Sequence, residues 1–199
     1  MFARDPLFWR AGAVSSLIVT LVVLAMLTTD TLRVITAGGQ NVPTYTVINH
    51  QIGYEYVTDR NEYMPTIGGQ EPLFGKIYSP AQAEALVRHG KLVIQSRACL
   101  DCHTMFGTGA YYAPDLTKAW LDPAWEHLWM PMTGTHTRAD AIAAFLQHPE
   151  QYPTWTREMP NLHLTLDEAQ AVVAYLKWVS AVNTNGFPYG FKTAAAGGT

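Results

Sequence analysis

The chain has 199 residues, which is room for one globular domain and a smaller appendage. Hydrophobic residues make up 48% of it and charged residues only 15%, below the roughly 25% of a typical soluble domain, so part of the chain is expected to avoid water. A formal net charge of -3 argues against nucleic-acid binding, and the 12% aromatic content argues against disorder. Two cysteines, Cys99 and Cys102, are too few and too close together for a disulfide scaffold.

An apolar segment near the N-terminus predicts a membrane helix. Nineteen uncharged residues lie between Arg10 and Asp30, nearly enough to cross a hydrocarbon core of about 30 Å. Phe8 and Trp9 lie at the start of this apolar segment, where aromatic rings favour the lipid headgroup layer. Arg4 and Arg10 precede the segment and predict a cytoplasmic N-terminus. A cleaved signal peptide is the alternative, but its apolar region is shorter and ends in small residues, whereas this one ends AMLTTD. We expect residues 1–30 to form an uncleaved, single-pass anchor in the cell membrane.

The remainder divides into three parts by composition. Residues 31–78 are rich in Gly, Pro, Asn, Tyr and Thr, and we expect them to be a membrane-proximal connecting segment. Within it, YTVINHQIGYEYV is β-branched and aromatic enough to predict one or two short strands. Residues 79–190 are expected to form one extracytoplasmic, mainly helical domain, followed by a flexible tail over residues 191–199.

A capping box predicts the first helix of this domain. Ser79 stands at the N-cap, Pro80 at the first helical position and Gln82 two residues later. The helix is expected to continue to about Arg97.

The rest of the domain contains many prolines and glycines. Residues 104–160 are therefore expected to be mostly loop, with a short helix over about 138–147. Thr165 and Glu168 form a second capping box, and the apolar residues after them recur at helical spacing. This last helix is expected to end before Asn183.

Residues 99–103 read Cys-Leu-Asp-Cys-His, the attachment sequence of c-type haem. Two thioether bonds to haem vinyl groups need two sulfurs about one helical turn apart, and the next residue then reaches the iron. Three alternatives remain. A thioredoxin-like redox pair needs a βαβ setting, and a structural zinc site needs a second pair of ligands. The third alternative is chance occurrence of the motif. We predict one covalent haem c on Cys99 and Cys102, with His103 as the proximal iron ligand.

An electron-carrying haem commonly has methionine as its second axial ligand. Met64, Met130 and Met159 all precede proline, which favours an extended backbone. Met159 comes after a stretch long enough to wrap the porphyrin and just before the last helix closes the fold. We therefore predict Met159 as the ligand. The alternatives are Met130, Met132 and His163.

The stretch CLDCHTMFGTGAYYAPDLTKAW closely resembles the cytochrome c subunit of the cytochrome c-dependent nitric oxide reductases, in which GxGAYxAPDL follows the haem motif. The segment MPNLHLTLDEAQAVVAYLKWVSAVNTNGFP is similar to the C-terminal part of that family, where the axial methionine precedes a helix. The resemblance covers about residues 80–190 and the N-terminal anchor. Residues 40–78 are longer than expected of the family. The matching positions in the first stretch are Gly107, Gly109, Ala110, Tyr111, Ala113, Pro114, Asp115 and Leu116.

The resemblance implies a class I cytochrome c fold. It also implies that the chain is not an enzyme on its own. Such a subunit receives electrons from a soluble cytochrome c or a small copper protein. It relays them to haem b of a large polytopic subunit, whose haem b3 and non-haem iron convert two NO to N2O. The resemblance also implies a calcium ion at the subunit boundary, with the carbonyl oxygens of Gly109 and Tyr111 as this chain's share.

Three functions are consistent with these features. The first is the electron-entry subunit of a nitric oxide reductase. The second is a free-standing membrane-tethered carrier, or the cytochrome c subunit of another haem-copper oxidase. The third, a haem-based gas sensor, needs an open iron position, which a Met159 ligand would close. The GTGAYYAPDL match favours the first.

Overall fold

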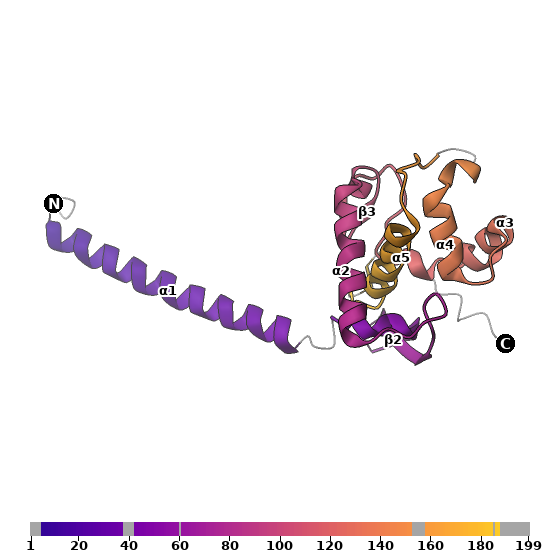
Figure 1. Cartoon of the computed structure of the whole chain (residues 1–199). Coiled ribbons are helices and arrows are strands. Elements are labelled where there is room, and N and C mark those ends of the chain that lie inside the picture. The colour runs from indigo at the N-terminus through magenta and orange to yellow at the C-terminus, as the bar shows by residue number, and fades with distance from the viewer. Residues whose placement is uncertain (1–4, 38–41, 60, 153–157, 185, 188–199) are drawn as a thin grey trace. The chain divides into compact units, whose positions relative to one another are not determined.

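The computed structural model divides the chain into two compact units, Met1–Gln40 and Asn41–Thr199, which are considered separately (Figure 1). The expected flexible tail over residues 191–199 lies outside the described residues. Those described are 5–37, 42–59, 61–152, 158–184 and 186–187.

The first unit is the helix α1, Pro6–Ala37. Its segment Pro6–Leu32 has a mean hydropathy of 2.2 in its most apolar window and buries none of it within the chain, so by length and composition it can cross a membrane. The helix is longer than the apolar run because Arg10 and Asp30 do not interrupt helical hydrogen bonding. The expected N-terminal membrane-type helix is thus present.

The second unit begins with a hairpin that belongs to its core. A 3-10 turn, η3 (Tyr45–Asn49), leads into strand β1 (His50–Val57), which pairs antiparallel with β2 (Glu62–Gln70). The predicted strands are therefore present, although the second one follows the segment from which they were predicted. Ile48 and Tyr54 from this region are buried against the helices.

Three longer helices follow the predicted pattern: α2 (Pro80–Ser96), α4 (Arg138–Gln147) and α5 (Leu166–Ser180). Both predicted capping boxes form, with Ser79 and Thr165 each accepting from the backbone N–H three residues later. These helix starts are set by local hydrogen bonds, which is why the sequence locates them.

The region expected to be mostly loop contains several short elements. It holds an aromatic cluster in which the Trp129 and Phe145 ring centroids lie 4.7 Å apart and Trp125 donates from its indole N–H to the Ala119 carbonyl at 2.8 Å. Gly134, at φ +67°, ends α3 in the left-handed conformation. The short elements are β3 (Thr104–Met105), β4 (Thr108–Gly109), η5 (Ala119–Leu121), the π-helical turn η6 (Trp125–Trp129), α3 (Met130–Thr133) and η7 (Pro149–Gln151).

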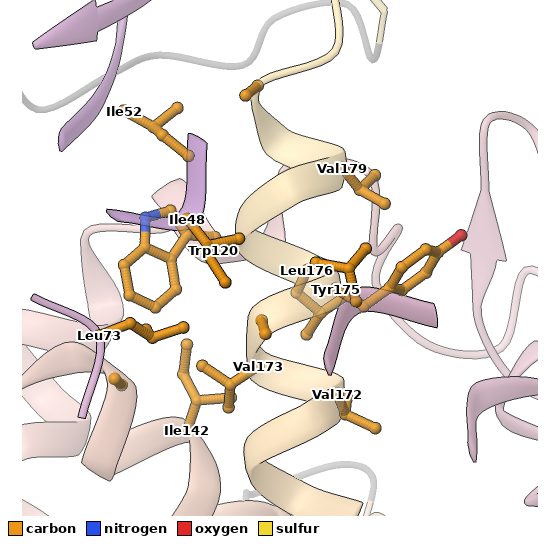
Figure 2. Close-up of a cluster of buried hydrophobic side chains, with 14 of the residues drawn as sticks. Ile48, Ile52, Leu73, Trp120, Ile142, Val172, Val173, Tyr175, Leu176 and Val179 are labelled. Atoms are coloured by element: carbon orange, nitrogen blue, oxygen red, sulfur yellow. The ribbon is translucent and has the colours of Figure 1, made fainter. Parts of the chain in front are cut away.

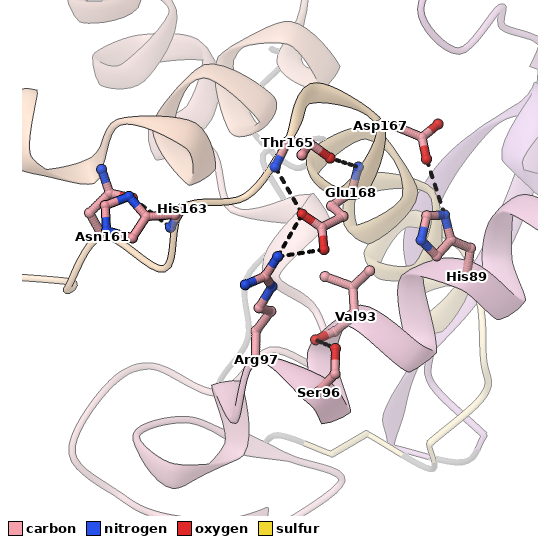
Figure 3. Close-up of polar contacts among 9 residues, drawn as sticks. All are labelled: His89, Val93, Ser96, Arg97, Asn161, His163, Thr165, Asp167 and Glu168. Atoms are coloured by element: carbon pink, nitrogen blue, oxygen red, sulfur yellow. Dashed lines mark hydrogen bonds and ion pairs between the residues drawn. The ribbon is translucent and has the colours of Figure 1, made fainter.

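The core is built around α5, whose apolar side chains meet Trp120, Leu73 and Ile142 from other elements (Figure 2). Helix α2 packs closely against α5 at Gly90. A Cβ atom there would lie 2.0 Å from the Ala171 carbonyl oxygen, so glycine is needed for this contact. At the far end of α2, Arg97 donates to both carboxylate oxygens of Glu168 at 2.7 and 3.0 Å (Figure 3). The same capping residue therefore starts α5 and joins it to α2.

Two lysines are buried in this core. The Lys118 ammonium donates to the carbonyls of Ser180 and Val182 at 3.1 and 2.7 Å, and burial lowers its pKa to about 7. Lys177 donates to Glu71 at 2.5 Å, and burial lowers its pKa against the opposing effect of that carboxylate. Among the described residues, no buried side-chain nitrogen or oxygen lacks a hydrogen-bond partner.

Candidate haem site

The CxxCH motif forms one tight turn directly after α2. Ala98 adopts a left-handed conformation at φ 54°, which ends the helix, and the 3-10 turn η4 (Cys99–Asp101) follows. The backbone N–H groups of Cys102 and His103 both donate to the Cys99 carbonyl, at 3.3 and 3.0 Å. The structure therefore brings both cysteines and the histidine together in a single turn, and each of the three is half-buried.

The environment of the thiols bears on the redox-pair alternative. Neither cysteine forms a disulfide. Burial raises the pKa of the Cys99 thiol, whereas a thiol–disulfide oxidoreductase needs a thiol whose pKa is lowered. The turn also does not lie in a βαβ unit of the thioredoxin kind, because α2 precedes it and the two-residue strands β3 and β4 follow. These features disfavour a redox pair.

The His103 ring is held in the tautomer that a metal ligand requires. Its Nδ1 lies 2.7 Å from the Pro114 carbonyl oxygen. Because a carbonyl can only accept, Nδ1 must carry a proton, so in the neutral ring the lone pair is on Nε2. Metal-ligating histidines are oriented in this way by a bond from the other ring nitrogen. The residues present thus fit a haem iron bound at Nε2.

The GTGAYYAPDL loop is bonded back onto the motif. Backbone N–H groups of Ala110 and Ala113 donate to the carbonyls of Leu100 and Cys102 at 3.0 and 2.8 Å. Gly109 makes this possible, because it has φ +120° and a Cβ atom there would lie 2.2 Å from the His103 carbonyl oxygen. This explains why a glycine is needed at this point of the motif.

The candidate axial methionines occupy different settings. Met130 lies in a helical conformation at φ −57° and ψ −47°, so the expectation that the following proline holds it extended is wrong. Proline is tolerated after it because Pro131 falls in the first turn of α3. Met64 lies in strand β2, and Met132 is exposed in α3. Met159 is half-buried in an irregular segment shortly before the cap of α5.

Sequence reasoning missed two parts of this site. The Pro114 carbonyl that orients His103 could have been suspected only from the motif match, since a backbone group leaves no compositional signal. The other part is Asp115, which the sequence shows only as one position of that motif. Its carboxylate accepts from the Thr117 backbone N–H at 2.8 Å and from the Thr104 hydroxyl at 2.7 Å.

The calcium expectation receives no support. Gly109 lies in β4 and Tyr111 is 82% exposed. Within the part of the chain that the structure describes, no group of three or more His, Cys, Asp or Glu side chains could hold a metal ion. A site built from carbonyl oxygens stays a prediction.

Comparison with known proteins agrees with the geometry of the motif. The cytochrome c family model matches residues 87–180. The nitric oxide reductase C subunit of Paracoccus denitrificans is 33% identical over 117 residues, covering 57% of this chain and 71% of that protein. The corresponding protein of Stutzerimonas stutzeri is 30% identical over 105 residues, covering 53% of this chain and 65% of that protein. With its mainly helical cytochrome c domain and an N-terminal helix that can span a membrane, the chain belongs to the family of cytochrome c subunits of nitric oxide reductases.

Proposed function

We propose that this chain is the electron-entry subunit of a nitric oxide reductase complex. The observation that carries the proposal is the His103 ring, whose Nδ1 is bonded to the Pro114 carbonyl and whose Nε2 is left to bind iron. That ring follows two cysteines presented by one turn, as attachment of a single haem c requires. When bound, the haem supplies reversible one-electron chemistry at its iron.

The residues of the chain hold and tune this group. Cys99 and Cys102 would form the thioethers, and His103 and Met159 would bind the iron. Met159 is supported by its half-buried place before the cap at Thr165, and by the helical conformation that removes the extended-backbone argument for Met130. A methionine sulfur stabilises reduced iron and raises the potential, as suits an acceptor of electrons from a soluble donor.

The reaction itself belongs to a partner. With His103 and Met159 both bound to the iron, this chain would offer no position at which two NO molecules could be coupled. We propose that electrons arrive from a soluble cytochrome c or a small copper protein. They leave to haem b of a large polytopic subunit, where NO is reduced to N2O. Helix α1 anchors the chain with its N-terminus in the cytoplasm and its haem domain outside.

Haem attachment is tested first. Cys99→Ser and Cys102→Ser should each leave one thioether, and the double variant should retain no haem after denaturing acid–acetone extraction. Ser96→Ala, three residues before the motif, is the matched control and should keep its haem, because its hydroxyl only donates to the Val93 carbonyl. A wild-type haem that extracts freely would contradict the proposal.

The role in the complex is tested by gentle solubilisation. A polytopic haem b protein should co-purify with the chain, and rapid mixing with a reduced donor should reduce haem c before haem b, followed by N2O release. A complex that reduces O2 but leaves NO untouched would make the chain an oxidase component. Purification without any large partner would make it a tethered carrier.

A further inference from the structure

We propose that Asp115 is a positioning residue for the histidine ligand: its carboxylate fixes the Pro114 carbonyl against His103 Nδ1, and through that bond sets how strongly the ring donates to the iron. This inference rests on the proposed haem ligation by His103. It concerns the tuning of the haem rather than its presence, so the two can fail separately.

Asp115 uses both carboxylate oxygens within the haem loop. One accepts from the Thr104 hydroxyl at 2.7 Å and the other from the Thr117 backbone N–H at 2.8 Å. Thr104 directly follows the ligand His103, and Asp115 directly follows Pro114, whose carbonyl the ring contacts. The carboxylate therefore links Thr104, which follows His103, to the segment that carries the Pro114 carbonyl.

The surrounding bonds leave this unit little freedom. The Thr104 carbonyl accepts from the Leu116 N–H at 2.8 Å, and the Thr117 hydroxyl accepts from the Phe106 N–H at 2.8 Å. Both threonines are buried, with 3% and 0% of their surface exposed. Together with these bonds, the two hydrogen bonds of the Asp115 carboxylate resist relative motion of the Thr104 and Thr117 segments.

Bonds from both neighbouring residues hold Pro114 in place. Pro114 has no N–H, so it makes no backbone donor bond itself. On its N-terminal side the Ala113 N–H bonds to the Cys102 carbonyl at 2.8 Å, and on its C-terminal side Asp115 supplies the bonds described above. Removing the Asp115 side chain leaves the C-terminal side of Pro114 held by the bond from the Leu116 N–H to the Thr104 carbonyl, but without the two carboxylate bonds.

The position of that carbonyl matters for the iron. A close Nδ1–H···O bond makes the imidazole more basic, which stabilises oxidised iron and lowers the potential. A looser bond is therefore expected to raise the potential and to expose the Nδ1 proton to exchange with solvent. Loss of a nearby negative charge also raises a haem potential, so the test must separate charge from position.

Four variants of the full chain in detergent make that separation. Asp115→Ala removes the charge and both bonds, and Thr104→Val removes one bond without changing charge. Asp115→Asn removes the charge but keeps an acceptor for the Thr117 N–H and a group that can bond the Thr104 hydroxyl. Asp101→Asn, an exposed acid inside the motif turn, removes an equal charge that is not part of these bonds.

Two measurements are read on each: the midpoint potential at fixed pH, and the exchange rate of the His103 Nδ1 proton in the reduced protein by NMR with ¹⁵N-histidine. Positioning predicts faster exchange and a raised potential in Asp115→Ala and Thr104→Val. In Asp115→Asn and Asp101→Asn the exchange rate should stay near wild type. The inference is overturned if Thr104→Val matches wild type in both measurements, or if Asp115→Ala matches Asp101→Asn. A wild type without a histidine-ligated haem would instead overturn the proposed function.

Discussion

The contact between α2 and α5 allows one substitution to be worked through in detail. Gly90→Ala adds a methyl group whose carbon would lie 2.0 Å from the Ala171 carbonyl oxygen and 2.8 Å from Tyr175 Cβ. Because these atoms are backbone or bonded directly to it, no change of rotamer relieves the overlap. The helices would have to separate by roughly 1.4 Å to restore an ordinary contact.

The expected cost follows from two opposing effects. Overpacking of a well-packed core costs about 1–3 kcal/mol, and a shift of two whole helices belongs at the upper end. Replacing a helical glycine by alanine returns about 0.5–1 kcal/mol. The net loss in free energy of unfolding is therefore expected to be about 2 kcal/mol. For a unit of this size that corresponds to a melting temperature about 4–8 °C lower.

Denaturant unfolding of the full chain in detergent, followed by circular dichroism, measures this loss. The matched control is Gly69→Ala in β2, where an added Cβ has nothing within 4 Å and the change should stay within about 0.5 kcal/mol. The m-value should be unchanged in both. A free energy of unfolding for Gly90→Ala equal to that of wild type, or higher by the amount expected from helix propensity, would contradict the close approach of α2 and α5 at Gly90.

Three further results are expected. Gly109→Ala should lower the yield of haem-loaded protein several-fold, measured as haem absorbance per polypeptide, because its Cβ would lie 2.2 Å from the His103 carbonyl oxygen; a normal yield would show that the loop adapts. Met159→Ala should abolish the weak far-red sulfur-to-iron absorption of the oxidised protein and lower the midpoint potential, whereas Met130→Ala should change neither; the reverse pattern would reassign the ligand. Burial lowers the pKa of Lys118 from its ordinary 10.5 to about 7, so the unfolded chain binds more protons between these pH values and the stability contributed by this group rises with pH there. Denaturant midpoints of Lys118→Met and wild type at several pH values should show that rise reduced in the variant, and identical pH profiles would contradict it.

The sequence predicts the elements whose signals are local. The capping boxes at Ser79 and Thr165 need only residues three positions apart, and both helices start where those residues stand. The Cys99–His103 turn is equally local, because its chemistry requires adjacent residues. Such features depend little on the rest of the fold.

Features that depend on distant partners were missed for a physical reason. A lysine in a helix reads as a solvated residue, yet Lys177 is fully buried because Glu71, 106 residues earlier in the chain, lies beside it. Met130 carries the same Met-Pro signal as Met159, but it lies in a helical conformation next to the packed rings of Trp125 and Trp129. Composition cannot separate these cases, since the deciding contacts are tertiary.

The segment before α2 illustrates what such distant contacts imply for function. A free carrier needs only a flexible tether at this point. Here the Tyr54 hydroxyl donates to the Ser180 carbonyl at 2.7 Å, the same carbonyl that Lys118 bonds from the end of the haem loop. Glu71 also contacts α5, through Lys177. Because the hairpin completes the carbonyl and lysine bonding at the end of α5, it belongs to the same packed unit as the CxxCH turn and is not a flexible tether.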